Sequence, residues 1–128
     1  MGERDLLSGL IRLHILHHAA HAPVFGLGLI EELGRHGYRL SPGTLYPILH
    51  GLEKGGFLHS HKERVAGRQR RLYEITDTGR AALAQGKVKV WELFRELFED
   101  ELRFTTQGRV ESQCRGSTQS DGAGDEPP

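Results

Sequence analysis

The segment from residue 40 to residue 58 constrains the fold of this chain more than any other. Its apolar residues are spaced three and four apart, which places them on one stripe of an α-helix: Leu45, Ile48, Leu49 and Leu52. The other positions are small, hydroxylated or basic: Gly43, Thr44, Tyr46, Pro47, His50, Gly51 and Lys54. A helix that buries one side and presents such residues on the other can enter the major groove of DNA. The segment therefore predicts the second helix of a helix-turn-helix.

The residues that flank this helix predict where it begins and ends. Ser41 is expected to cap it through its hydroxyl, and Pro42 suits the first turn, where a missing N–H is harmless. Pro47 lies inside the helix and removes one backbone hydrogen bond. Gly55 and Gly56 are expected to stop the helix.

A β-hairpin is predicted after this helix. Residues 57–63 and 70–75 have the composition of two strands, with residues 65–69 as the connecting tip. Side chains alternate along a strand, so Arg70 and Arg71 should lie on opposite faces, and at most one of them faces DNA together with Arg68. A run of charges is usually a solvated face, but beside a recognition helix it favours phosphate contact or insertion of the tip into the minor groove. The hairpin is therefore predicted to be the wing of a winged helix.

The charge distribution supports this interpretation although the net charge of the chain is zero. Residues 54–80 contain seven Lys and Arg against three acids, a net +4, whereas residues 90–128 contain nine acids against four Arg, a net −5. A local basic patch matters more for DNA binding than the net charge of the whole chain, because phosphate contacts supply most of the non-specific affinity for DNA. The acidic region over residues 90–128 is compatible with a surface for another partner.

The rest of the chain predicts three further helices. One covers residues 5–20, one opens at Pro23 and ends at Gly37, and one of roughly 25 residues is capped by Thr76 or Asp77. We expect an α+β, mainly helical, winged helix-turn-helix over residues 1–76 and a dimerisation helix over residues 77–104. Residues 105–128 are rich in Gly, Ser, Thr, Gln and Pro and are predicted to be a disordered tail.

Composition excludes several protein classes. Cys114 is the only cysteine, so a disulfide framework or a cysteine-based zinc site within one chain is excluded. The mixed-charge start does not have the pattern of a signal peptide, and no apolar run approaches the roughly 18 residues of a membrane helix. We expect a soluble, cytoplasmic protein.

Two motifs resemble those of the PadR family of bacterial winged-helix transcriptional regulators. The first is residues 40–47 with Leu49, Leu52-Glu53 and Gly56, and the second is residues 67–73 with Ile75-Thr76 and Gly79. Together with Phe25-Gly26 and the first helix, the similarity spans about residues 5–103. The resemblance implies a homodimer built from the C-terminal and first helices. It also implies repression of nearby genes, with release by a small effector.

Candidate DNA-contacting residues come from the recognition helix and the wing. They are Ser41, Gly43, Thr44, Tyr46, Pro47, His50, Lys54, Arg64, Arg68 and Arg70. Instead of contacting DNA, Tyr46 could pack on the first helix, and Lys54 could be a solvated surface charge. The expected partner is a double-stranded, palindromic operator.

An aromatic stripe on the last helix predicts an interface. Leu10 of the first helix and Trp91, Phe94, Leu97 and Phe98 of the last helix form either the core of a dimer interface or a pocket for an effector. An aromatic stripe at helical spacing is more often an interface core, which favours the first alternative.

Four histidines near the end of the first helix have another possible role. His14, His17, His18 and His21 are related by steps of three and four, which can bind a metal. No carboxylate or cysteine is near them in sequence, and histidines also interact well with the negative end of a helix, so no metal or other cofactor is assigned. The rival functions are a protein-interaction module, for which a basic wing is not needed, and a metal-dependent sensor or enzyme, for which an accompanying acid and nucleophile are missing. We expect a binding protein and not an enzyme.

Overall fold

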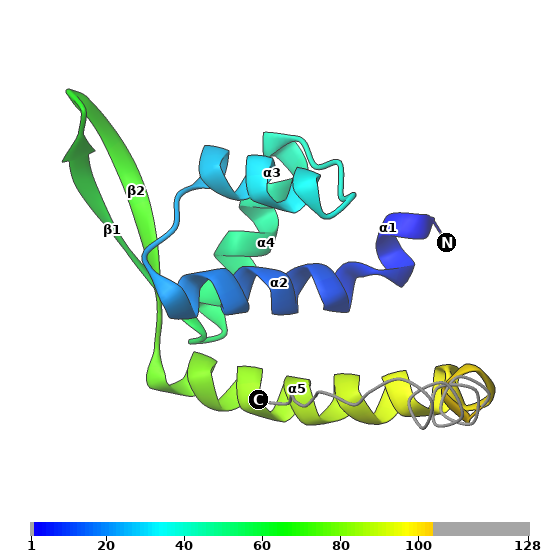
Figure 1. The fold of residues 1–128 in the computed structure, drawn as a ribbon. Coiled ribbons are helices and arrows are strands. Elements are labelled where there is room, and N and C mark those ends of the chain that lie inside the picture. The colour runs from blue at the N-terminus through cyan, green and yellow to red at the C-terminus, as the bar shows by residue number, and fades with distance from the viewer. Residues whose placement is uncertain (1, 104–128) are drawn as a thin grey trace, which may run out of the picture. The chain divides into compact units, whose positions relative to one another are not determined.

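The computed structural model describes residues 2–103, and its named elements are five helices and two strands (Figure 1). In order they are α1 (Glu3–Leu6), α2 (Ser8–His21), α3 (Gly26–Arg35), α4 (Pro42–Lys54), β1 (Leu58–Val65), β2 (Arg68–Ile75) and α5 (Asp77–Leu97). Of the described residues, those up to Lys87 form one compact unit, here the winged unit, and those from Val88 to residue 103 belong to a second, here the C-terminal unit. The predicted tail over residues 105–128 lies outside the described residues. No described helix is both long enough and apolar enough to span a membrane.

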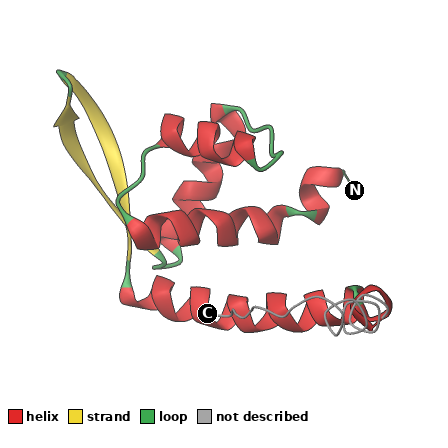
Figure 2. Cartoon of the chain, viewed as in Figure 1, coloured by secondary structure: helices red, strands yellow, loops and turns green. Residues whose placement is uncertain are grey.

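The winged unit is a helix-turn-helix with a β-wing, as predicted. Figure 2 shows the yellow β1–β2 hairpin projecting from the red helices α2, α3 and α4. The core beneath it comes from all of these elements: Ile11, Ile15, Leu16 and Ala19 of α2, Leu29 and Leu33 of α3, Leu40, Leu45, Leu49 and Leu52 around α4, and Leu58 and Tyr73 of the hairpin. Burying one large aliphatic side chain stabilises a fold by roughly 1.5–3 kcal/mol, so this cluster holds the three helices and the hairpin together.

The first two helices depart from their predicted bounds. The predicted helix over residues 5–20 is interrupted at Leu7, which separates α1 from α2. The prediction that Pro23 opens the next helix was wrong, because α3 begins at Gly26. The reason is a β-bridge: Val24 and Tyr73 exchange backbone hydrogen bonds of 2.9 and 2.7 Å, which holds the chain extended just before α3.

Helix α4 has the predicted bounds, but its cap differs. Pro42 lies in its first turn, Gly55 ends it, and it continues through Pro47. Ser41 occupies the N-cap with extended backbone, and its carbonyl accepts the N–H groups of Thr44 and Leu45. Its hydroxyl does not cap the backbone, so that prediction was wrong. The hydroxyl donates instead to Thr44 Oγ1 at 3.4 Å.

The wing is longer than predicted. The predicted five-residue tip is a two-residue turn, because β1 extends to Val65 and β2 starts at Arg68. Ala66 (φ 53°) and Gly67 (φ 79°) both have positive φ, as in the type I′ turns that match the twist of paired strands. After the hairpin, Thr76 caps α5 as predicted: its Oγ1 accepts the Gly79 N–H at 2.9 Å.

Candidate nucleic-acid interface

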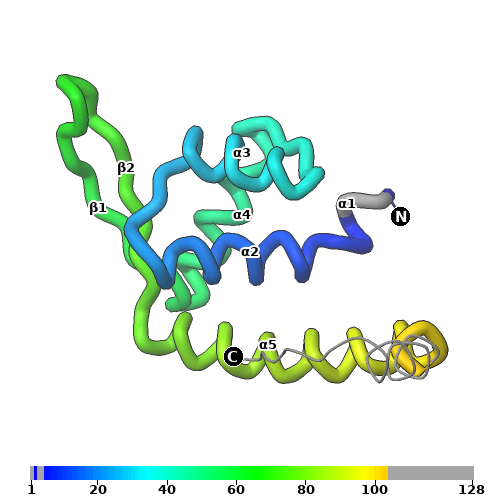
Figure 3. The backbone as a smooth tube through the Cα atoms, in the orientation of Figure 1, coloured from blue at the N-terminus to red at the C-terminus, as the bar shows by residue number. Residues whose placement is uncertain are grey.

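The exposed side of α4 forms a continuous stripe. Gly43, Pro47, His50 and Lys54 are exposed, whereas Leu45, Leu49 and Leu52 are buried. The exposed positions are spaced three and four apart, so they lie on one face of the helix. Figure 3 shows α4 following α3 through the turn formed by residues 36–41, the arrangement of a helix-turn-helix. Recognition helices of this kind present such a face to base edges.

Tyr46 lies between this stripe and the core. It is half-buried and packs against the core cluster. Its hydroxyphenyl group lies directly over Gly26 of α3, where an added Cβ would overlap the Tyr46 hydroxyl. Tyr46 therefore packs on α3, and the small residue at position 26 is what allows α4 to approach α3.

The wing arginines have different surroundings. Arg68 is exposed next to the turn, and Arg64 donates from Nη1 to the Gly67 carbonyl at 3.0 Å. Arg70 is half-buried, with its guanidinium 4.5 Å from the centre of the Phe25 ring, a cation–π contact. As predicted from strand alternation, Arg71 lies on the other face, since it reaches Ser60, the residue paired with Tyr73. Arg68 is therefore an exposed cation at the end of the wing, whereas Arg70 packs on Phe25 at the start of α3.

A polar network joins the end of α4 to the wing, and sequence reasoning missed it. The Glu53 carboxylate accepts a hydrogen bond from the Ser60 N–H at 3.2 Å. The Ser60 hydroxyl lies 2.9 and 2.8 Å from the two carboxylate oxygens of Glu53. Arg71 Nη1 donates to the Ser60 hydroxyl oxygen at 3.0 Å. Ser60 is buried, so these charge-assisted bonds are stronger than exposed ones. The network sets the position of the recognition helix relative to the hairpin.

Tyr73 lies beside this network. It has no exposed surface, and burial raises the pKa of its phenol, with Arg71 acting in the opposite direction and Glu53 adding to the rise. Its phenol stays protonated under ordinary conditions, so Tyr73 serves as a core residue whose backbone also pairs with Val24.

The C-terminal unit presents the aromatic stripe that the sequence predicted. Trp91, Phe94, Leu97 and Phe98 are all exposed, at 60, 39, 62 and 43%. The Trp91 and Phe94 rings lie 5.7 Å apart between centroids, and those of Phe94 and Phe98 lie 5.0 Å apart. Leu10, in the winged unit, is also exposed. Contiguous exposed apolar groups of this kind mark an interaction surface.

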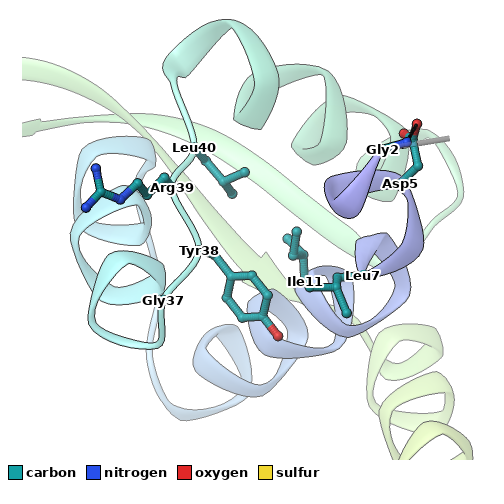
Figure 4. Close-up of a pocket in the computed structure, with 8 residues that line it drawn as sticks. All are labelled: Gly2, Asp5, Leu7, Ile11, Gly37, Tyr38, Arg39 and Leu40. Atoms are coloured by element: carbon teal, nitrogen blue, oxygen red, sulfur yellow. Dashed lines mark hydrogen bonds between the residues drawn. The ribbon is translucent and has the colours of Figure 1, made fainter.

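A cavity of about 690 Å³ lies in the winged unit (Figure 4). It is formed by the N-terminal segment, the start of α2 and the turn between α3 and α4, and its lining is Gly2, Asp5, Leu7, Ile11, Gly37, Tyr38, Arg39 and Leu40. Tyr38 and Ile11 point into it from opposite walls, while Arg39 and Asp5 lie at its two ends. None of its lining residues belongs to the aromatic stripe, for which the sequence left an effector pocket as the less favoured alternative.

The four predicted histidines have different surroundings, although the rings of His17 and His18 also lie 5.2 Å apart between centroids. His17 and His21 pair with each other, with ring centroids 4.7 Å apart, and His21 Nδ1 lies 2.9 Å from the His17 carbonyl. His14 and His18 instead gather with His36. Sequence reasoning missed His36 because it comes from the end of α3, 18 positions beyond His18 in the chain.

Comparison with known proteins identifies the family. Residues 15–85 match the sequence model of the transcriptional regulator PadR-like family, which is more than half of the chain. The chain belongs to the PadR-like family of transcriptional regulators. It is 53% identical to the transcriptional regulator Rv3488 of Mycobacterium tuberculosis over 94 residues, which are 73% of this chain and 88% of that protein.

Solved structures of PadR-like regulators are similar in fold as well. A PadR-like transcriptional regulator from Bacillus cereus has a TM-score of 0.67 at 27% identity, over 77% of this chain and 96% of that one. A PadR family regulator from Eggerthella lenta has a TM-score of 0.64 at 26% identity, over 77 and 86% of the two chains. The resemblance of the two sequence motifs to this family is thus confirmed.

Proposed function

We propose that this PadR-like protein binds operator DNA through α4 and the wing. The observation that carries the proposal is the exposed stripe Gly43, Pro47, His50 and Lys54, backed by a buried leucine face and joined to the wing through Glu53. A rigid helix with small and cationic residues outward suits the major groove. The basic balance of residues 54–80 adds non-specific phosphate affinity.

Individual residues receive different roles in this proposal. Ser41 and Thr44 lie at the N-terminus of α4, where backbone N–H groups and the helix dipole favour a phosphate. His50 and Lys54 lie further along the stripe and follow the groove. Tyr46 positions α4 through its packing on Gly26. Arg64 and Arg68 contact the phosphate backbone of the DNA from the wing.

We further propose that the protein acts as a homodimer on a palindromic operator. The exposed Trp91, Phe94, Leu97 and Phe98 support this, because an apolar stripe of this length is stable in water only when covered. Leu10 is assigned to the same interface. Two recognition helices would then enter successive major grooves, about 34 Å apart.

Repression and release by a small effector complete the proposal, and both rest on the family. An effector at the aromatic stripe would act on the spacing of the two half-sites. Deleting the gene should raise expression of a reporter driven by its own upstream region. A reporter that falls or does not change would contradict repression.

Fluorescence anisotropy with the DNA upstream of its own gene tests the DNA-binding role. Lys54→Ala should weaken operator binding several-fold, whereas the matched control Lys89→Ala, an exposed lysine of the C-terminal unit, should leave it unchanged. Equal effects of the two variants, or affinity no greater than for unrelated DNA, would instead favour a winged helix used for protein contacts.

A further inference from the structure

Three imidazoles from two helices converge in the winged unit. His14 and His18 lie one turn apart on α2, and His36 is the C-cap of α3. Each offers one ring nitrogen, and the three nitrogens lie within 4.8 Å of one another. The ring centroids of His14 and His36 are 4.7 Å apart, and those of His18 and His36 are 5.9 Å apart.

A carboxylate from α3 joins the imidazoles. Glu32 lies one turn before His36, and its Oε2 is 3.9 Å from His18 Nε2 and 3.8 Å from His36 Nε2. Its other oxygen, Oε1, accepts a hydrogen bond from Arg35. Each helix thus supplies a pair of ligand residues at i, i+4 spacing, and together they present three nitrogens and one oxygen.

Hydrogen bonding does not account for this arrangement. His18 Nε2 is buried and has no hydrogen-bond partner among residues 2–103, and separations of 3.8–3.9 Å are longer than a hydrogen bond. Desolvation lowers the pKa of His14, and the neighbouring His36, His18 and His17 lower it further.

We propose that His14, His18, His36 and Glu32 form a binding site for a divalent transition-metal ion of the zinc class. Zn²⁺ takes four N, O or S ligands in a tetrahedron at about 2.0–2.2 Å, which sets neighbouring ligand atoms roughly 3.4 Å apart. Binding therefore requires the side chains to close in from the present separations, which reach up to 4.8 Å among the three nitrogens and are 3.8–3.9 Å from Glu32 Oε2 to His18 and His36. Imidazole and carboxylate together suit zinc, and the thiolates that soft ions prefer are not needed.

The surroundings of the site are suited to an ion. A cavity of about 220 Å³, lined by both His18 and Glu32, opens beside the cluster and provides a path for entry. Arg35 holds the second carboxylate oxygen of Glu32 and orients it, as outer partners of metal ligands commonly do.

Occupancy of the site would connect α2 to α3, the helix that leads through residues 36–41 to recognition helix α4. A bound ion would therefore bias the position of α4 and change operator affinity. This consequence rests on the proposed DNA-binding function, whereas the metal site does not.

Calorimetric titration of the full-length chain, freed of metal by a chelator, with Zn²⁺ alone tests the site. We expect one ion per chain. His36→Gln should weaken binding by at least about 100-fold, because loss of an outer partner alone commonly costs 10–100-fold. The matched control His21→Gln, on the same helix as His14 but outside the cluster, should bind like the wild type. The same results are expected in a Cys114→Ser background, which removes the thiol. Circular dichroism verifies that each variant is folded, and Glu32→Gln replaces any that is not.

Two outcomes would overturn the proposal: no Zn²⁺ binding by the wild type, or equal binding by wild type, His36→Gln and Glu32→Gln. Co²⁺ provides a second readout, since a tetrahedral site gives it intense visible absorption that His36→Gln should abolish. Measuring operator affinity in parallel separates the two proposals. A chain that binds Zn²⁺ but not DNA supports the site and contradicts the proposed function, and a chain that binds DNA but not Zn²⁺ does the reverse.

Discussion

The winged unit and the C-terminal unit use the same apolar pattern with opposite results. In the winged unit, Ile15, Leu33, Leu45 and Leu49 have no exposed surface. Between residues 88 and 103 every residue is exposed, and the large apolar side chains there are no exception. Both regions space their apolar residues three and four apart. The difference teaches that periodicity predicts that a face will be covered, but not whether the same chain covers it.

The largest expected effect comes from charging the exposed stripe. Phe94→Glu with Phe98→Glu should convert a dimer into a monomer, because burial of each Phe is worth roughly 1.5–3 kcal/mol and a buried carboxylate adds a desolvation cost. Operator affinity should fall with it, since two half-sites are no longer linked. Light scattering measures the mass, with Lys89→Glu as the control. A variant that stays dimeric with wild-type affinity would place the interface elsewhere.

A core truncation in the winged unit should affect stability before assembly. Leu49→Ala removes a side chain with no exposed surface and should lower the free energy of unfolding by about 2–5 kcal/mol. Thermal unfolding followed by circular dichroism measures the loss. The replacement Leu97→Ala, at an exposed position, should leave monomer stability nearly unchanged. If both variants lost a similar free energy of unfolding under monomeric conditions, the contrast between a covered face in the winged unit and an uncovered face in the C-terminal unit would be wrong.

Breaking the polar network of Glu53, Ser60 and Arg71 should weaken DNA binding, although the network consists of only a few hydrogen bonds. Ser60→Ala leaves Glu53 and Arg71 without their shared hydroxyl, and a hydrogen bond to a charged group contributes about 1.5–3 kcal/mol. The wing should then lose its fixed position relative to α4. We expect weaker operator binding by a folded dimer, and an unchanged dissociation constant would show that the network is structural only.

The smallest expected effects are those of replacing Arg68 and Arg70 of the wing, and the two replacements should differ in what they change. Arg68→Ala should reduce the slope of log affinity against log salt by about 0.9, the value of one phosphate contact. Arg70→Ala should mainly lower stability, by about 0.5–1 kcal/mol, through loss of the Phe25 contact. Titrations at several salt concentrations measure both, and a larger slope change for Arg70→Ala than for Arg68→Ala would reverse the assignment.

The parts of the fold that depend on local chemistry could be predicted from the sequence. The apolar stripe of α4, Pro42 in its first turn and Gly55 at its end predicted that helix within its observed bounds. Strand alternation likewise separated Arg70 from Arg71. Each of these features depends on residues within a few positions of one another.

Two of the features that could not be predicted involve residues distant in sequence, and a third is a local backbone conformation. The start of α3 depends on Tyr73, which is 49 positions beyond Val24. Glu32 and His36 join His14 and His18 only once α2 and α3 pack together. The two-residue turn of the wing requires a positive φ at Ala66, for which alanine has no intrinsic preference. No residue pattern along the chain indicates these pairings.

The bridge between Val24 and Tyr73 has a consequence for how the winged unit unfolds. It fastens the segment between α2 and α3 to the strand that follows the wing turn, so this segment can move away only when both of its hydrogen bonds to β2 break. Helices and hairpin should therefore unfold as one cooperative unit. The amide protons of Val24 and Tyr73 should exchange with solvent only as fast as the whole unit opens, as slowly as those at the centre of α4.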